Sequence, residues 1–194
     1  MKLLHIDSSA LGANSVTREL SAAVVARWQD AIPALSVQYR DLDAEPIPHL
    51  TGRTLAKADP AEADEGERAI QQFLDADVIV IGSPMYNFGV SSTLKAWIDR
   101  VAVAGRTFRY TEAGPEGLAK GKRVIVATGR GGIHTGAPTD FQEPYLRQVF
   151  GFLGIDQVEF VRAEGVAYSP QHRADALAAA HAAIPALAPQ RLAA

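Results

Sequence analysis

Short apolar runs alternate with segments of helical periodicity along the chain, and this alternation predicts repeated strand and helix units around a parallel sheet. The runs 78–81 and 124–127 are continuously apolar, as expected of central strands that helices cover on both faces. Residues 35–40 instead alternate between apolar and polar, which favours an edge strand with one wetter side. The expected strands are residues 3–6, 35–39, 78–81, 124–127 and 158–161.

Helical stripes lie between these strands. Apolar residues recur every four positions from Val16 to Trp28 and predict a helix that begins near Ser15. Ser91 or Ser92 is expected to cap a second helix. This second helix is expected over 94–101. Two more helices are expected, over 141–153 and in an alanine-rich segment after Pro170 that Pro185 ends or kinks.

Two segments, 44–60 and 105–121, fit no regular element, and long connections of this kind are usually functional or mobile. The length of 194 residues predicts one domain over residues 1–194, with 105–121 as an excursion, since a domain takes about 150 residues. The chain has no cysteine, which excludes thiolate catalysis, iron–sulfur clusters and cysteine-ligated zinc. The histidines show no metal-ligand spacing, so no metal is expected.

The distribution of charge along the chain excludes some classes of binding partner. A net charge of -3 with mixed signs gives no basic face for nucleic acid. At the N-terminus Asp7 interrupts the apolar run before a signal peptide or membrane span could form. We therefore expect a cytoplasmic protein without a nucleic-acid or membrane partner.

The loop after the first strand is rich in hydroxyl groups and leads into a helix. Ligands of doubly wound sheets bind outside the carboxyl ends of the strands, and a helix N-terminus favours an anion. The loop matches neither G-x-x-x-x-G-K-[ST] nor G-x-G-x-x-G, so it suits a single terminal phosphate held by Ser9, Ser15 and Thr17. Taken alone, an equally good interpretation is that Ser15 and Thr17 only cap the helix.

Two further loops follow the buried strands. Met85, Tyr86, Asn87 and Phe88 combine flat apolar surface with polar groups, which a flavin ring needs, although Tyr86 and Phe88 could simply pack in a turn. The glycines of segment 129–132 would let the backbone approach a ligand closely, but turns use glycine too. The position of both loops beside the first favours a common site.

At this point the chain resembles a known family, the bacterial FMN-dependent NADH-azoreductases, which are also NADH:quinone reductases. The resemblance covers nearly the whole chain and implies an α/β, flavodoxin-like fold, with a five-stranded parallel sheet in the order 2-1-3-4-5 and helices on both faces. The motifs that carry it are Pro84-Met85-Tyr86-Asn87-Phe88, Thr107-Phe108-Arg109-Tyr110-Thr111-Glu112 with Gly114-Pro115-Glu116-Gly117-Leu118, and Arg130-Gly131-Gly132-Ile133-His134.

The resemblance further implies one non-covalent FMN per subunit. The residues implied to hold its phosphate are Ser9, Ser15, Val16 and Thr17, and those implied to hold its ring are Met85, Tyr86, Asn87, Phe88, Gly129, Arg130, Gly131 and Gly132. Members often have serine in place of Gly129, so only backbone contact is expected there unless Thr128 compensates. A homodimer with each flavin near the subunit boundary is implied as well, with Phe108 and Tyr110 walling the substrate space.

The implied activity is the use of NADH to reduce quinones to hydroquinones and to cleave aromatic azo compounds to amines, by a ping-pong two-electron mechanism. The choice between NADH and NADPH stays open. No catalytic residue is strictly required because the flavin carries the difficult chemistry. His134 is the candidate proton donor or substrate contact, since histidine changes protonation near neutral pH.

Two alternatives remain. A flavodoxin-like electron carrier would bind FMN and serve protein partners, and it should be markedly acidic. A structural or regulatory α/β domain would bind no flavin. The mild charge and the aromatic excursion favour an enzyme with a small-molecule pocket.

Overall fold

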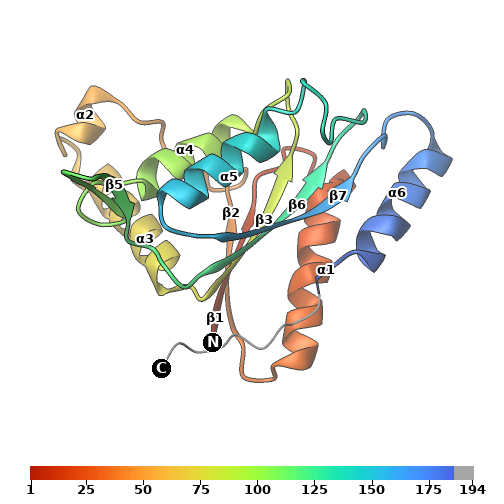
Figure 1. The fold of residues 1–194 in the computed structure, drawn as a ribbon, viewed down its shortest axis with the longest axis horizontal. Coiled ribbons are helices and arrows are strands. Elements are labelled where there is room, and N and C mark those ends of the chain that lie inside the picture. Colours follow the sequence, from red (N-terminus) through yellow and green to blue (C-terminus); the bar gives the residue numbers. More distant parts are fainter. Residues whose placement is uncertain (186–194) are drawn as a thin grey trace.

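A parallel sheet of five strands forms the centre of the computed structural model, which describes residues 1–185 (Figure 1). Its strand order is β2-β1-β3-β6-β7. The bounds are β1 Lys2–Asp7, β2 Ser36–Asp41, β3 Val78–Pro84, β6 Arg123–Gly129 and β7 Gln157–Ala163. All five predicted strands are confirmed, and the predicted order holds for the parallel strands counted alone. The numbering differs because two short strands, β4 and β5, intervene.

Strand burial follows the hydrophobic pattern. Every residue of β3 is buried, and β6 is buried except at its last position. By contrast, β2 lies at the sheet edge, and its residues are exposed or half-buried. The continuous and the alternating patterns therefore distinguish central from edge strands correctly.

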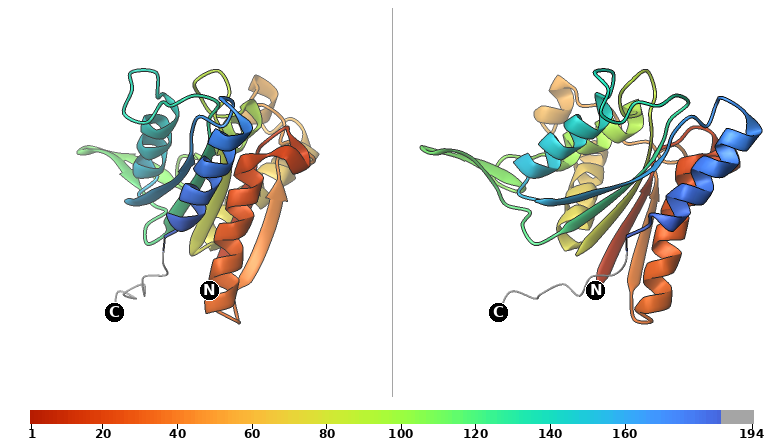
Figure 2. Two further views of the ribbon diagram at one scale, coloured as in Figure 1. Left: turned by 90° about the vertical axis from the view of Figure 1, so that its right-hand side faces the viewer. Right: turned by 45° about the vertical axis from the view of Figure 1, so that its right-hand side comes forward.

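Helices cover both faces of the sheet (Figures 1 and 2). On one face α1 and α6 pack on a core that includes Leu20 and Val80, and on the other α3, α4 and α5 pack on a core that includes Trp97 and Ile81. The helix bounds are α1 Val16–Ala31, α3 Pro60–Asp75, α4 Ser92–Val101, α5 Gln142–Phe152 and α6 Pro170–Ala182. Among the described residues, none of the helices combines the length and the apolar character that crossing a membrane requires.

The caps agree with the sequence where a cap was predicted. Ser15 accepts a hydrogen bond from the N–H of Arg18 at the start of α1, and Ser91 accepts one from Leu94 at the start of α4. The segment 44–60 contains one short helix, α2 Gly52–Leu55, that was not expected. The predicted domain runs on to residue 194, and residues 186–194 lie outside the described part.

The excursion at 105–121 is a hairpin. Its strands, β4 Phe108–Thr111 and β5 Gly114–Gly117, pair antiparallel to each other and form a sheet of their own. Figure 2 shows it projecting from the side of the molecule. Phe108 anchors its base, since its ring lies 4.5 Å from that of Phe152.

Candidate functional site

Three loops meet at the carboxyl edge of the sheet. We call them loop 1 (residues 8–15), loop 2 (85–91) and loop 3 (130–141), after β1, β3 and β6. The hydroxyls of Ser9 and Tyr86 lie 3.3 Å apart and join loops 1 and 2. The N–H of Met85 donates to the carbonyl of Gly129 over 3.0 Å and joins loop 2 to the start of loop 3.

The end of β6 also lies close to the start of α1. A Cβ atom added at Gly129 would lie 3.0 Å from the Cγ2 methyl of Thr17 and 3.3 Å from Cγ1 of Val16. A side chain there would push against the start of α1. Thr128 is fully buried, and its hydroxyl faces the carbonyl of Val161 at 3.5 Å.

Loop 1 and the start of α1 place buried hydroxyl groups beside a helix N-terminus. Ser9, Ser15 and Thr17 are all buried, and the hydroxyls of Ser15 and Thr17 lie 3.1 Å apart. Ser15 Oγ also accepts from the N–H of Arg18 at 3.3 Å, so Ser15 is an N-cap. The first N–H groups of a helix have no partner inside it, and they attract anions.

Loop 2 is a tight turn. Tyr86 and Gly89 exchange two backbone hydrogen bonds of 3.0 Å, and between them Asn87 and Phe88 have φ of +49° and +70°. The Tyr86 hydroxyl accepts from the N–H of Ala10 and so turns back toward loop 1. Half of the Phe88 side chain is exposed at the tip, and Met85 is half-buried at the base. The turn thus presents aromatic surface beside the open edge of the sheet.

Loop 3 brings His134 to the same place. Its ring packs edge-on against that of Phe88, with centroids 5.8 Å apart, and its Nδ1 lies 3.0 Å from the hydroxyl of Thr139. A Cβ added at Gly132 would lie 3.1 Å from His134 Nε2 and 3.6 Å from the hydroxyl of Tyr168. Two polar side-chain ends therefore converge on Gly132, where a Cβ would crowd the ring of His134, while Gly131 is exposed.

The side chain of Arg130, in the segment that was predicted to hold the ring, is fully buried and points into the protein. Its guanidinium donates to Asp140 at 3.1 Å, to Glu143 at 3.1 Å and to Glu164 at 3.1 Å. Its backbone N–H donates to Ala163, and its carbonyl accepts from Val166. Arg130 therefore holds loop 3 in place.

Glu164, just after β7, was not singled out from the sequence. One of its oxygens accepts from the backbone N–H groups of His134 at 2.8 Å and Thr135 at 2.9 Å. Burial acts to raise the pKa of Glu164, but these hydrogen bonds and the one from Arg130 outweigh it, so the pKa lies below its usual range. Its position just after β7, at the carboxyl end of a strand of the parallel sheet, was the sequence signal that could have identified Glu164 as a site residue. Tyr168, which follows β7 as well, was not predicted either, and the same signal applied to it.

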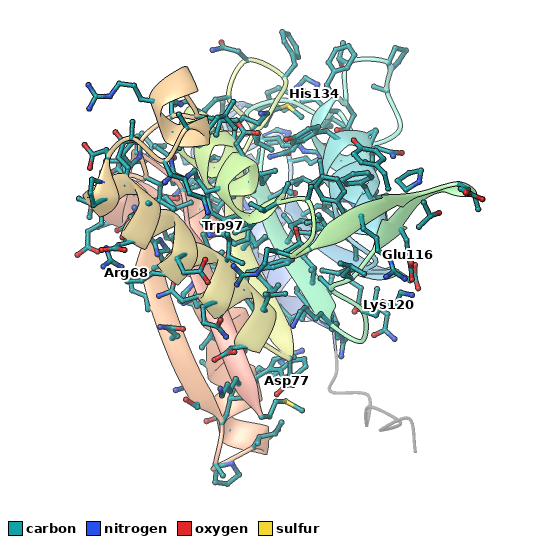
Figure 3. All side chains as sticks on the ribbon, turned by 90° about the vertical axis from the view of Figure 1, so that its left-hand side faces the viewer. Arg68, Asp77, Trp97, Glu116, Lys120 and His134 are labelled. Carbon is teal, nitrogen blue, oxygen red and sulfur yellow. The ribbon has the colours of Figure 1, made fainter. Side chains whose placement is uncertain are left out.

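The two predicted substrate residues lie elsewhere in the single chain. Phe108 is buried in the base of the hairpin, and Tyr110 on the same strand is exposed. In Figure 3 His134 stands at the top of the molecule, whereas Glu116 of the hairpin projects far to one side. The structure thus brings the predicted cofactor loops and His134 together, but not Phe108 and Tyr110.

Known proteins resemble this chain over nearly all of its length. A family model described as a flavodoxin-like fold matches residues 1–187. The FMN-dependent NADH:quinone oxidoreductase of Stenotrophomonas maltophilia (strain K279a) is 69% identical over 185 residues, which is 95% of each chain. FMN-dependent NADH:quinone oxidoreductase 1 of Xanthomonas axonopodis pv. citri (strain 306) is 70% identical over 184 residues, again 95% of each.

Solved structures give the same result. The azoreductase from Bacillus anthracis str. Sterne has a TM-score of 0.84 at 27% identity, covering 94% of this chain and 95% of that one. The FMN-dependent NADH-azoreductase from Bacillus anthracis str. Ames Ancestor, solved in complex with FMN, has a TM-score of 0.85 at 27% identity, covering 94% and 95%. The resemblance seen in the sequence motifs is confirmed, and the chain belongs to the flavodoxin-like family and, within it, to the FMN-dependent NADH:quinone oxidoreductases.

Proposed function

We propose that this chain is an FMN-dependent enzyme that uses NADH to reduce quinones to hydroquinones and to cleave aromatic azo compounds to amines. The observation that carries the proposal is the meeting of loops 1, 2 and 3 at one edge of the sheet, joined through Ser9, Tyr86, Met85 and Gly129. Relatives about 70% identical over most of the chain are named for the quinone activity, which supports the choice.

The residues of loop 1 and of the start of α1 fit the phosphate of FMN. The hydroxyls of Ser9, Ser15 and Thr17 can rotate to donate, and the backbone N–H groups of Val16 and Thr17 belong to the first turn of α1. No lysine lies among these residues, so binding depends on hydroxyls, N–H groups and the helix dipole. This donor set suits one phosphate.

Loops 2 and 3 fit the ring. Met85 and Phe88 supply apolar contact, and Asn87 an amide, while Gly131 and Gly132 leave the backbone free of side chains on the other side. Bound FMN would supply two-electron redox chemistry, taking electrons from NADH and passing them to an acceptor in a ping-pong cycle. The protein then has to hold flat molecules in place and keep water away from them.

His134 and Tyr168 are the side chains that we propose to act on the acceptor. Both bring a polar atom close to the position that a Cβ of Gly132 would take. An oxygen or nitrogen of an acceptor held there would gain electron density as it is reduced. Thr139 and Phe88 fix the histidine ring. We propose that His134 donates a hydrogen bond or a proton there, and that Tyr168 donates a second hydrogen bond.

The proposal includes a homodimer and a cytoplasmic location. In one chain the hairpin with Phe108 and Tyr110 projects away from the loops (Figures 2 and 3). If these residues wall the substrate space, as the resemblance implies, they must do so in a second copy of the chain. Tyr110, with 75% of its surface exposed, is free to reach such a partner.

The test begins with cofactor binding. We expect the purified protein to be yellow and to bind one FMN per subunit, and protein that shows no saturable FMN titration would refute the proposal. Steady-state rates with NADH and benzoquinone should give parallel double-reciprocal lines. An azo dye and NADPH in the same assay measure acceptor and donor preference. FMN binding without turnover of any small acceptor would favour the electron carrier instead.

A further inference from the structure

Arg18 stands where a basic residue would be expected to hold a phosphate, directly after the hydroxyl-rich loop. Its guanidinium points the other way. Nη2 and Nε donate to the backbone carbonyl of Ser9 over 2.8 and 3.2 Å. Nη1 and Nη2 also form a forked pair with the carboxylate of Asp41, at 2.6 and 2.7 Å. Arg18 thus ties loop 1 to the end of β2.

Every nitrogen of the guanidinium has a partner on this side. Nη1 additionally donates to the hydroxyl of Tyr39 over 3.2 Å, and that hydroxyl donates to Asp7 over 3.1 Å. The hydrogen bond to Asp41 raises the pKa of Arg18, and the same hydrogen bond lowers the pKa of Asp41. Burial raises the pKa of Tyr39 to about 12, and the Asp7 charge adds to this. Arg18 therefore stays positively charged, Asp41 negatively charged and Tyr39 neutral across the physiological pH range.

Asp41 is itself fixed. Its Oδ1 accepts from the backbone N–H groups of Asp43 at 3.0 Å and Ala44 at 3.3 Å, in the turn after β2. With its carbonyl held by Arg18, Ser9 keeps its hydroxyl near Tyr86 and accepts from the N–H of Leu11 over 3.3 Å. A forked guanidinium can bridge a carbonyl and a carboxylate at once, which an ammonium group or an amide cannot reproduce.

We propose that Arg18 and Asp41 form a clamp that positions loop 1 for the FMN phosphate, with Arg18 acting on the Ser9 carbonyl and not on the phosphate. The inference rests on the proposed function and adds to it a determinant of phosphate affinity. The clamp fixes the position of Ser9 before any ligand binds. Loss of the clamp should therefore weaken the binding of a ligand that has a phosphate more than the binding of one that lacks it.

The test compares FMN with riboflavin, which lacks the phosphate. For Arg18→Gln in full-length protein stripped of flavin, we expect the FMN Kd to rise about tenfold, since the variant loses hydrogen bonds of a charged group. The riboflavin Kd should stay within experimental error. Arg27→Gln is the matched control, because Arg27 lies on the same helix and donates to the carbonyl of Ile184 over 2.7 Å. It should leave both constants unchanged.

Two variants separate the clamp from other roles. Asp41→Asn should also weaken FMN selectively; if Arg18 instead contacts the phosphate, freeing it from Asp41 should tighten FMN and would overturn the proposal. Arg18→Lys keeps the charge without the fork, so full FMN affinity in this variant would contradict a clamp. An equal loss for FMN and riboflavin would show a merely structural role.

The outcomes also distinguish the two proposals. If the wild-type protein does not bind FMN, the proposed function is refuted. If the wild-type protein binds FMN but Arg18→Gln has the same ratio of FMN Kd to riboflavin Kd as the wild type, only the clamp is refuted. Circular dichroism of each flavin-free variant checks folding. Should Arg18→Gln not fold, the titration of Asp41→Asn decides alone: a selectively raised FMN Kd supports the clamp, and an unchanged or lowered FMN Kd refutes it.

Discussion

Phe88 has a backbone conformation that large side chains rarely adopt. Its φ of +70° lies in the left-handed region, where a residue with a Cβ loses about 1–2 kcal/mol per residue. Because half of the side chain is exposed, burial of the ring offsets little of this. The two hydrogen bonds between Tyr86 and Gly89 hold the turn in this form, with the ring against His134.

A comparison of Phe88→Gly with Phe88→Ala measures this strain. Both variants remove the ring, but only glycine relieves the positive φ, so we expect the glycine variant to be more stable by about 1 kcal/mol. For a chain of this size that corresponds to a melting temperature about 2–4 °C higher in flavin-free protein. Equal melting temperatures would mean that the turn is not strained at Phe88. Both should raise the KM for quinone, whereas His172→Ala should not.

At the scale of elements, the segments after β6 and β7 are joined along their length. Backbone hydrogen bonds run from Gly165 to Gly132 and from Ala167 to Gly131. Glu164 adds its hydrogen bonds to the N–H groups of His134 and Thr135. The Glu164 carboxylate therefore contributes to the position of the loop 3 backbone at His134.

That dependence predicts a pH effect. Since the folded-state pKa of Glu164 is lowered, its charge stabilises the fold above the ordinary carboxylate pKa, and this contribution is lost as pH falls through the folded value. We expect Glu164→Gln to lower the free energy of unfolding by about 1 kcal/mol at pH 7, since a hydrogen-bonding oxygen remains but the charge is gone. Urea unfolding at pH 7 and pH 3.5 should show the difference shrinking at the lower pH. A constant difference would contradict the assignment.

The elements that the sequence predicts well are those whose pattern reflects their own burial. Apolar runs identify β3 and β6 because both faces are covered, and period-four stripes identify α1. The hairpin escapes because each of its strands has four residues, most of them exposed or half-buried. Helix α3 was also not predicted, although Asp59 before Pro60 is a typical helix start.

In the candidate site, too, some features could be predicted from the sequence and others could not. Ser9, Tyr86 and Gly129 were predictable together because the carboxyl ends of parallel strands share one edge. The directions of Arg18 and Arg130 were not, since their carboxylate partners, among them Asp41 and Asp140, come from other elements or from farther along the same loop. A basic residue next to a phosphate loop looks like a ligand until its carboxylate partner is known.

At the scale of the whole molecule, the hairpin and the three-loop site lie at different places on the surface of one subunit. Phe108 and Tyr110 pack edge-on with centroids 5.5 Å apart, so the base of the hairpin holds the tyrosine in place at an exposed position. An exposed aromatic residue on a projecting hairpin suits contact with a second copy. Sedimentation velocity should therefore show a dimer, and Tyr110→Ala should raise the KM for quinone while leaving the FMN Kd unchanged.

Mixed dimers test whether Tyr110 contributes to the site of its own subunit or to the site of the partner subunit. We would combine Tyr110→Ala chains with Phe88→Ala chains and isolate the heterodimer through two different affinity tags. If Tyr110 serves the partner, the site of the Tyr110→Ala chain has a wild-type Phe88 and a wild-type Tyr110 from the other subunit, while the second site carries both lesions. The heterodimer should then show a wild-type KM for quinone at about half the turnover, since one site in two is intact. If Tyr110 serves its own chain, each site carries one lesion, and no site with wild-type KM should appear.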